Sequence, residues 1–195
     1  MLIDLAQIVR ERRLPVGRVI HVGGNIGEEG ELYSSWGSQV IWFEPRADAA
    51  MQIRRKYPTH IVVEAAAGAT VGFSPIWLAS NGQSSSLLRP RAHLELHPEI
   101  SFERSCEVPV IPVDLVAQES DALVVDAQGY EEYVLEGARK CLGRCQWVYL
   151  EVNRAELFKG CPTIERLDEL LVRHRRVETR WVLGRNWGDA LWVLK

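Results

Sequence analysis

A glycine-rich turn that directly follows an apolar run is the strongest chemical signal in this sequence. The residues Val19-Ile-His-Val-Gly-Gly-Asn-Ile-Gly27 read as a buried strand, a tight turn and the start of a polar, helix-compatible segment. Glycine lets the backbone approach a ligand closely, and the exposed amides at the beginning of a helix attract an anionic group. The pattern indicates a site for a nucleotide or a nucleoside.

An acidic residue ends the next apolar run. Glu44 follows Trp42-Phe43 and stands 20 positions after Gly24. A carboxylate at this place in an α/β fold can accept hydrogen bonds from both hydroxyls of a ribose. The alternative interpretation is that Glu44 is a solvated carboxylate at a strand end. The glycine turn favours the ribose interpretation.

The spacing of the glycines distinguishes between nucleoside ligands. A dinucleotide-binding turn has the form G-x-G-x-x-G, but a reading from Gly23 places Asn25 and Glu28 where the later glycines should stand. The observed spacing, Gly23-x-x-x-Gly27, is the form found in methyltransferases that use S-adenosylmethionine. That cofactor has no pyrophosphate, and its amino-acid end needs only a close approach of the backbone.

The elements that must position these residues alternate between short apolar runs and helix-compatible stretches. Unbroken apolar runs rich in Val, Ile and aromatic residues are typical of strands buried on both faces of a parallel sheet. They occur at residues 19–22, 40–43, 61–63, 122–125 and 147–152. Two further runs, 177–183 and 190–194, flank a glycine-containing turn and predict an antiparallel hairpin. The expected fold is α/β, a doubly wound and mostly parallel sheet that ends in this hairpin.

The length of 195 residues favours one domain over the whole chain, 1–195. We expect an N-terminal helix over 1–18. Residues 80–108 read as an irregular insertion, because they contain a serine-rich stretch and several prolines. Long irregular segments in a domain are usually functional, so this one is a candidate lid over a substrate.

Composition excludes several classes of partner. The formal net charge is −3, and no basic excess points to a nucleic acid. The apolar runs are too short for a membrane span, and the N-terminus does not resemble a signal peptide. Four cysteines without such a signal fit free thiols and a cytoplasmic protein. No metal-binding pattern is complete: His93 and His97 stand four apart, but Pro98 follows, and a surface helix is favoured.

Several motifs together resemble the FkbM methyltransferase family. The stretch Ala122-Leu-Val-Val-Asp-Ala-Gln-Gly-Tyr-Glu-Glu-Tyr-Val-Leu-Glu-Gly-Ala138 resembles the family signature K-I-D-V-E-G-x-E-x-x-V-L-x-G-A. The glycine turn resembles D-V-G-A-N-I-G, and Phe43-Glu-Pro45 resembles f-E-P. Further similar segments are 81–86, 113–115 and 150–153. The resemblance covers roughly residues 19–153 in the family's order, and implies a class I methyltransferase (Rossmann-like) fold.

The resemblance also implies chemistry: methyl transfer from S-adenosyl-L-methionine to a hydroxyl of a sugar, a glycan or a secondary metabolite. The expected cofactor-binding residues are His21, Gly23, Gly24, Asn25, Gly27, Glu44, Pro45, Ala66, Asp126 and Gln128. Asp126 is the first candidate for the base that removes the hydroxyl proton, since strand ends on this side of the sheet face the ligand. Its alternative role is to cap the following helix. Glu151 is the second catalytic candidate, and Ser85, Glu131 and Asn153 are expected to contact the acceptor.

Three departures from the family pattern keep other functions open. His21 replaces an Asp, Val124 a Lys and Gln128 a Glu. These changes favour, as an alternative, a non-catalytic module that binds S-adenosylmethionine or another nucleoside. A nicotinamide-dependent oxidoreductase is disfavoured by the glycine spacing and the hairpin. The segment Trp187-Gly-Asp189 either lines an acceptor pocket or packs the hairpin, and packing is favoured. A homodimer is compatible with the sequence.

Overall fold

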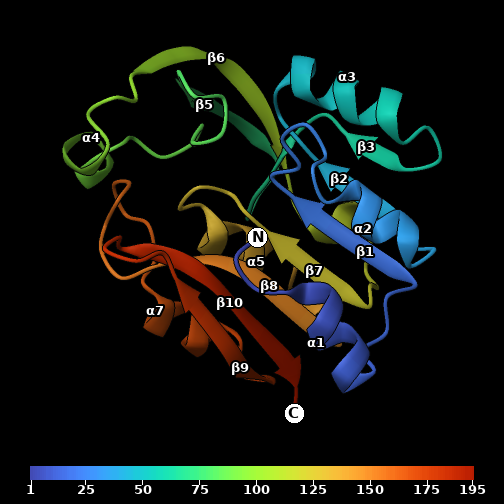
Figure 1. The fold of residues 1–195 in the computed structure, drawn as a ribbon. Helices are drawn as coiled ribbons and strands as arrows, with labels where there is room; N and C mark the ends of the chain where they lie inside the picture. The colour runs from blue at the N-terminus through green and yellow to red at the C-terminus, as the bar shows by residue number, and fades with distance from the viewer.

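The centre of the molecule is a seven-stranded sheet (Figure 1). This computed structural model describes the backbone of residues 1–195 and the side chains of all of them except 104–106. The strands are β1 (Arg18–Val22), β2 (Gln39–Phe43), β3 (Ile61–Val63), β7 (Ala122–Val125), β8 (Trp147–Asn153), β9 (His174–Trp181) and β10 (Trp187–Leu194). Their order in the sheet is β3-β2-β1-β7-β8-β10-β9.

The direction of the strands follows the prediction. The pairs from β3 to β8 are all parallel, and β10 pairs antiparallel with both β8 and β9. The doubly wound, mostly parallel sheet with an antiparallel hairpin at the C-terminus is therefore confirmed. The five parallel strands begin and end within one residue of the apolar runs that predict them.

Helices cover both faces of the sheet. The first face packs against α1 (Leu5–Arg12), α2 (Gly30–Ser35) and α3 (Ala47–Lys56). The second packs against α5 (Glu131–Gly137), α6 (Arg139–Leu142) and α7 (Ile164–Leu170). The N-terminal helix is shorter than the expected 1–18: Asp4 accepts a hydrogen bond from the Gln7 amide at its start, and Arg13 ends it in a left-handed conformation.

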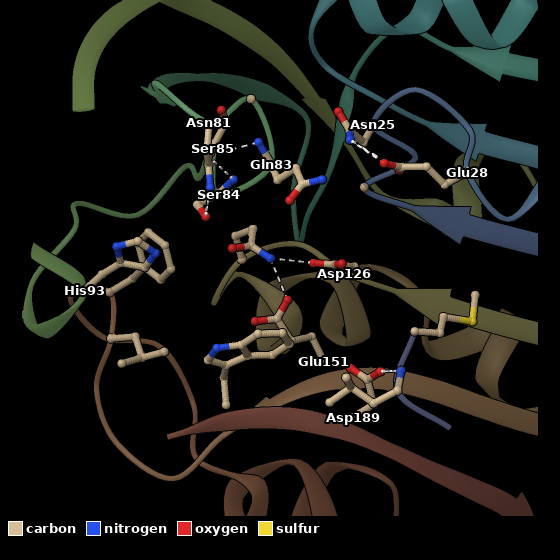
Figure 2. Close-up of a pocket in the computed structure, with 18 of the residues that line it drawn as sticks. Asn25, Glu28, Asn81, Gln83, Ser84, Ser85, His93, Asp126, Glu151 and Asp189 are labelled. Carbon is tan, nitrogen blue, oxygen red and sulfur yellow. Dashed lines mark hydrogen bonds between the residues drawn. The ribbon is translucent and has the colours of Figure 1, made fainter. Parts of the chain in front are cut away.

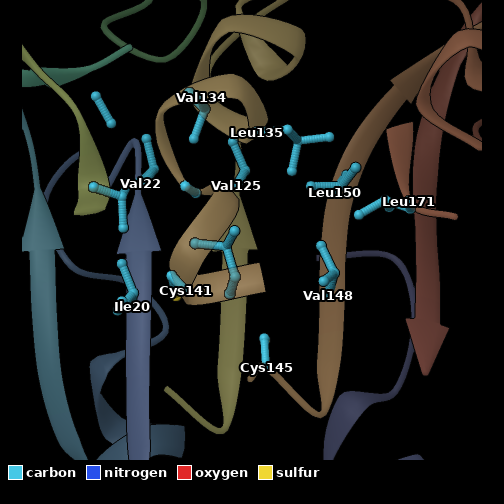
Figure 3. Close-up of a cluster of buried hydrophobic side chains, with 14 of the residues drawn as sticks. Ile20, Val22, Val125, Val134, Leu135, Cys141, Cys145, Val148, Leu150 and Leu171 are labelled. Carbon is cyan, nitrogen blue, oxygen red and sulfur yellow. The ribbon is translucent and has the colours of Figure 1, made fainter. Parts of the chain in front are cut away.

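The larger apolar core lies between the sheet and the second set of helices (Figure 3). Val125 and Leu150 of adjacent strands are fully buried there, below Val134 and Leu135 of α5. Cys141 and Cys145 belong to the same core, and burial raises the pKa of the Cys145 thiol to about 12. Cys141, Cys145 and Cys161 are free, as expected, and the side chain of Cys106 lies outside the described residues.

A second, three-stranded sheet corrects the extent of the expected irregular insertion. It contains β4 (Ala66–Ala67), β5 (Gly72–Ala79) and β6 (Phe102–Ile111), in the order β4-β6-β5. Residues 102–108 are thus strand, and the irregular part ends before them, with α4 (Ala92–Leu96) inside it. Pro75 and Pro109 conceal the two long strands in the sequence, because proline is rare inside sheets. In Figure 1 the strand β1 points toward the region formed by β5, β6 and α4.

Candidate functional site

A cavity of about 500 Å³ opens at the carboxyl ends of the parallel strands (Figure 2). Val22 of β1 pairs with Val125 of β7, which pairs with Leu150 of β8. The residues that come directly after these three, Gly23, Asp126 and Glu151, therefore lie side by side in one row. Asp189 of β10 pairs with Glu151 and extends this row. The cavity is within the usual size of small-molecule sites, about 300–1,000 Å³.

Gly23 lines the cavity at the point where the turn meets the end of β7. Its φ is +80°, and a Cβ atom placed on it would lie 1.7 Å from the Asp126 carbonyl oxygen. The Gly23 and Gly24 amides both donate to the Phe43 carbonyl oxygen, at 2.9 and 3.2 Å. The turn is therefore fixed between β2 and the end of β7, and only glycine fits at its first position.

Glu44 is buried and holds the turn from the β2 side. Its Oε2 accepts from the Asn25 amide at 2.8 Å, and its Oε1 accepts from the Arg46 amide at 2.9 Å. The Arg46 guanidinium donates to Asn25 Oδ1 at 2.6 Å and lies 3.5 Å from Glu44 Oε1. Burial raises the pKa of Glu44, and the contacts from Arg46 and Asn25 oppose this shift.

A smaller hollow of about 50 Å³ adjoins the cavity beside Glu44. Among its walls are Pro45, Ala66, Ala67 and Ala127, which are small and mostly apolar. A hollow of small apolar residues next to a carboxylate, and a glycine turn whose Gly23 and Asn25 line the cavity, suit the base, the ribose and the amino-acid end of a nucleoside cofactor. The residues present therefore fit the cofactor that the sequence implies.

Asp126, Gln128 and Glu151 form a hydrogen-bonded cluster on the cavity floor (Figure 2). Gln128 Nε2 lies 2.7 Å from Asp126 Oδ1 and 2.5 Å from Glu151 Oε2. Gln128 has φ +51°, and the Ser86 hydroxyl donates to its carbonyl oxygen at 2.7 Å. Burial and the neighbouring Asp126 raise the pKa of Glu151 well above its usual value. The floor thus combines an exposed carboxylate with a buried carboxyl group whose pKa burial and the neighbouring Asp126 raise.

His21 reaches the cavity from β1 in a neutral form. Its Nδ1 lies 2.9 Å from the Tyr33 hydroxyl, and its ring stacks on Trp42 with the ring centroids 4.7 Å apart. Burial lowers the pKa of this imidazole. A family carboxylate is thus replaced here by an uncharged aromatic group.

Two expected acceptor residues, Glu131 and Asn153, are buried away from the cavity lining. Glu131 is fully buried, and its Oε1 accepts from the Ala127 and Gly129 amides at 3.0 and 3.1 Å. Glu131 therefore stabilises the turn before α5, so the capping role considered for Asp126 is wrong. Asn153 is 1% exposed at the end of β8. Asn153 is the last residue of β8 and Glu131 is the first residue of α5, and both residues are buried.

The other expected site residues line one or both of the two hollows, or they pack beneath the glycine turn. Lining the larger cavity are His21, Gly23, Asn25, Ser85, Asp126, Gln128 and Glu151. Lining the smaller one are Gly23, Glu44, Pro45, Ala66, Ser85 and Asp126. Gly24 and Gly27 instead pack under the turn, since a Cβ on them would meet Trp42 at 2.8 Å and Tyr57 at 3.1 Å. The Ser85 hydroxyl is already bonded to the Ala79 amide.

Several lining residues have no counterpart among the expected site residues. Asp189 accepts hydrogen bonds from the Tyr149 hydroxyl and from the Leu2 amide. Asp189 belongs to the segment 187–189, for which the sequence offered an acceptor pocket as one alternative, and it lines the cavity. Trp187 packs against Leu157, Phe158 and Cys161, as favoured, and it also lines the cavity. His93, expected on a surface helix, is instead 5% exposed and lines the cavity from α4.

Among the side chains that the structure describes, no three His, Cys, Asp or Glu residues gather closely enough to hold a metal ion. None of the helices in the described chain combines the length and the hydropathy of a membrane-spanning segment.

Solved structures with similar folds are methyltransferases of low sequence identity. A TehB-like SAM-dependent methyltransferase from Corynebacterium glutamicum matches with a TM-score of 0.55 and 12% identity, over 96% of this chain and 86% of that one. The magnesium protoporphyrin IX methyltransferase ChlM from Synechocystis, solved with bound SAM, matches with a TM-score of 0.57 and 9% identity, over 97% and 76%. An rRNA methylase from Streptococcus thermophilus gives 0.55 and 10%, over 100% and 96%. These similarities identify the class I methyltransferase fold.

No curated protein matches the chain significantly. The family model for the methyltransferase FkbM domain matches residues 21–179. This match spans the glycine turn, Glu44, Asp126, Glu151 and most of β9, and it ends before β10. The chain belongs to the FkbM methyltransferase domain family, whose methyl donor is S-adenosyl-L-methionine.

Proposed function

We propose that this protein transfers the methyl group of S-adenosyl-L-methionine to a hydroxyl group on a sugar, a glycan or a secondary metabolite. The observation that carries the proposal is the position of Asp126, an exposed carboxylate on the cavity floor directly beside the Gly23 turn. A hydroxyl acceptor must lose its proton during transfer, and a carboxylate within reach can take it.

The cofactor is held by the turn and by the end of β2. The methionine part lies against Gly23 and Asn25, the ribose hydroxyls bond to Glu44, and the base enters the hollow beside Pro45 and Ala66. When bound, S-adenosyl-L-methionine supplies a methyl group on a positively charged sulfur. Glu28, Glu29 and Asp126 line the same cavity, and their carboxylates favour a cationic ligand there.

Asp126 Oδ2 is the atom that receives the acceptor proton. The Gln128 amide holds Oδ1 at 2.7 Å, which fixes the direction of the carboxylate. Burial raises the pKa of Glu151 well above the usual value, which favours the uncharged form of this group beside Asp126. Glu151 Oε2 accepts a hydrogen bond from the Gln128 side-chain amide and so positions that amide.

The segment before β6 closes the cavity over the acceptor. Asn81, Gln83 and Ser84 line it from the turn after β5. Closing a site excludes water and favours transfer to the bound hydroxyl. We expect S-adenosylhomocysteine to slow proteolytic cleavage within 80–101, and an equal rate with and without this ligand contradicts the lid.

Transfer of labelled methyl groups tests the proposed function. The protein is incubated with S-adenosyl-L-methionine, labelled on the methyl group, and with a panel of glycosides, glycan fragments and phenols. We expect label in the acceptor as a base-stable methyl ether. Tight cofactor binding without transfer to any acceptor favours the non-catalytic module instead. Label on nitrogen or carbon of the acceptor contradicts O-methylation.

A further inference from the structure

The two ends of the cavity differ in chemistry. Carboxylates gather at the end formed by the glycine turn and β7, where Glu28, Glu29 and Asp126 line it. The other end is formed by α4, the chain after β8 and the start of β10, and is lined by His93, His97, Ile100, Leu157, Phe158 and Trp187. A cationic cofactor belongs at the acidic end, so the acceptor belongs at the imidazole and aromatic end.

His93 is fixed firmly at this second end. Its backbone amide donates to the Leu157 carbonyl oxygen at 3.1 Å, which ties α4 to the chain after β8. Its ring centroid lies 4.7 Å from that of His97, 5.1 Å from Phe102 and 5.3 Å from Phe158. The imidazole is therefore held by aromatic rings from three segments of the chain, with 5% of the residue exposed.

One nitrogen of this imidazole has no hydrogen-bond partner in the protein. Nδ1 is buried and has no hydrogen-bond partner, although buried polar groups in proteins are nearly always paired. Burial and the neighbouring His97 lower the pKa of His93, so the ring is neutral near pH 7. A neutral imidazole has one N–H donor and one bare nitrogen, and can therefore bond a hydroxyl group in either direction.

Figure 2 shows His93 across the cavity from Asp126 and Glu151, on the side away from Asn25. A ligand that bridges these walls has a hydroxyl near the carboxylate row and a second polar group near the imidazole. Trp187 is half-buried, lines the same cavity and offers aromatic surface to the apolar face of a ring.

We propose that His93 is an acceptor-binding residue: its imidazole bonds a hydroxyl of a ring compound whose apolar face packs on Trp187. This inference rests on the proposed function for the identity of the cavity as a transfer site. A saccharide and a polyhydroxylated aromatic compound share the required chemistry. The role of His93 is to bind and orient the acceptor, and the reacting proton goes to Asp126.

Binding experiments test this role without turnover. The protein, saturated with S-adenosylhomocysteine, is titrated with methyl hexopyranosides in one arm and with catechol and resorcinol in the other. The wild type is compared with His93→Phe, which keeps an aromatic ring, with His93→Gln, which restores a hydrogen-bonding side chain, and with Glu95→Gln as a control. Glu95 is exposed on the same helix.

We expect at least one arm to bind, with the ring signals of His93 shifting in NMR spectra of histidine-labelled protein. His93→Phe weakens acceptor binding about 3- to 10-fold, the effect of one neutral hydrogen bond. His93→Gln recovers part of the affinity for the acceptor, and Glu95→Gln binds the acceptor as tightly as the wild type does. The affinity for S-adenosylhomocysteine stays within twofold in all variants.

Two outcomes overturn the assignment: binding of a probe with equal affinity by wild type and a folded His93→Phe, or no perturbation of His93 by any probe. Failure of the proposed function is a separate result. In that case a probe binds and shifts His93, but no methyl group is transferred to it.

Discussion

Gly23 and Asp126 lie against each other at the ends of adjacent strands, so closely that a Cβ on Gly23 would stand 1.7 Å from the Asp126 carbonyl oxygen. The Asp126 amide donates to the Val22 carbonyl oxygen at 2.9 Å, which continues the pairing of β1 and β7 to this point. The backbone contact brings the glycine turn and the candidate base together. The proposed sites for the cofactor and for the acceptor proton are therefore adjacent.

Gly23→Ala is expected to destabilise the fold. The methyl group meets backbone, and Gly23 has φ +80°, so about 3 kcal/mol or more of unfolding free energy should be lost. Denaturation in urea measures this. Gly37→Ala is the matched control, because Gly37 has φ +70° but no atom within 4 Å of its added Cβ, and should cost only about 1–2 kcal/mol. Equal losses in the two variants contradict the close contact.

Glu44→Gln is expected to weaken cofactor binding. A carboxylate that bonds the ribose contributes about 1.5–3 kcal/mol, so the dissociation constant of S-adenosylhomocysteine should rise roughly tenfold or more. Titration calorimetry measures it. Glu64→Gln is the control, since Glu64 is an exposed carboxylate paired with Arg54 near the same sheet edge. If Glu44→Gln binds the ligand as the wild type does, the ribose assignment is wrong.

Asp126→Asn is expected to reduce methyl transfer about 10²–10⁴-fold, the usual contribution of a general base. Asn keeps the size of the side chain and an oxygen for the Gln128 amide, so affinity for S-adenosylhomocysteine should change little. Single-turnover transfer and calorimetry on the same samples separate the two effects. Unchanged transfer in Asp126→Asn excludes Asp126 as the base, and Glu151 is then the next candidate.

The stability of the fold should depend on the protonation of Glu131. Burial raises the pKa of this carboxyl from 4.5 to about 7 in the folded protein. Because the folded state binds the proton more tightly, the stabilisation is complete below pH 4.5 and is lost as pH rises through 7. The linked free energy is about 3 kcal/mol.

Urea denaturation at pH 5 and pH 7.5 measures this effect. Wild type should lose more stability than Glu131→Gln between the two values, since the amide does not titrate. Comparing the two proteins cancels the contribution of His21, whereas the part of the Glu151 shift that Glu131 causes is removed together with the Glu131 carboxyl. A parallel pH dependence of wild type and variant contradicts the raised pKa.

The sequence could predict the parallel strands because they are buried on both faces and read as unbroken apolar runs. The glycine turn and Glu44 could be placed for a similar reason: a strand end fixes where the following residue emerges. The strands β5 and β6 escaped prediction, because Pro75 and Pro109 interrupt their pattern and their pairing is non-local. Local pattern does not encode which distant segment supplies a partner.

The far wall of the cavity could not be predicted from sequence. The role of His93 depends on rings from β6 and from the chain after β8, which the sequence does not place together. Glu131 belongs to a family motif and was expected at the acceptor, but its carboxyl bonds two amides of its own turn. A motif identifies a residue as constrained, whereas only the fold shows whether it faces ligand or backbone.

A structure of the protein with bound S-adenosylhomocysteine tests the central claim most directly. The account predicts that the ribose hydroxyls bond to the Glu44 carboxylate, that the homocysteine part lies on the Gly23 turn, and that the sulfur faces the Asp126 row. A ligand bound elsewhere, or a cavity that stays empty at saturating concentration, contradicts it.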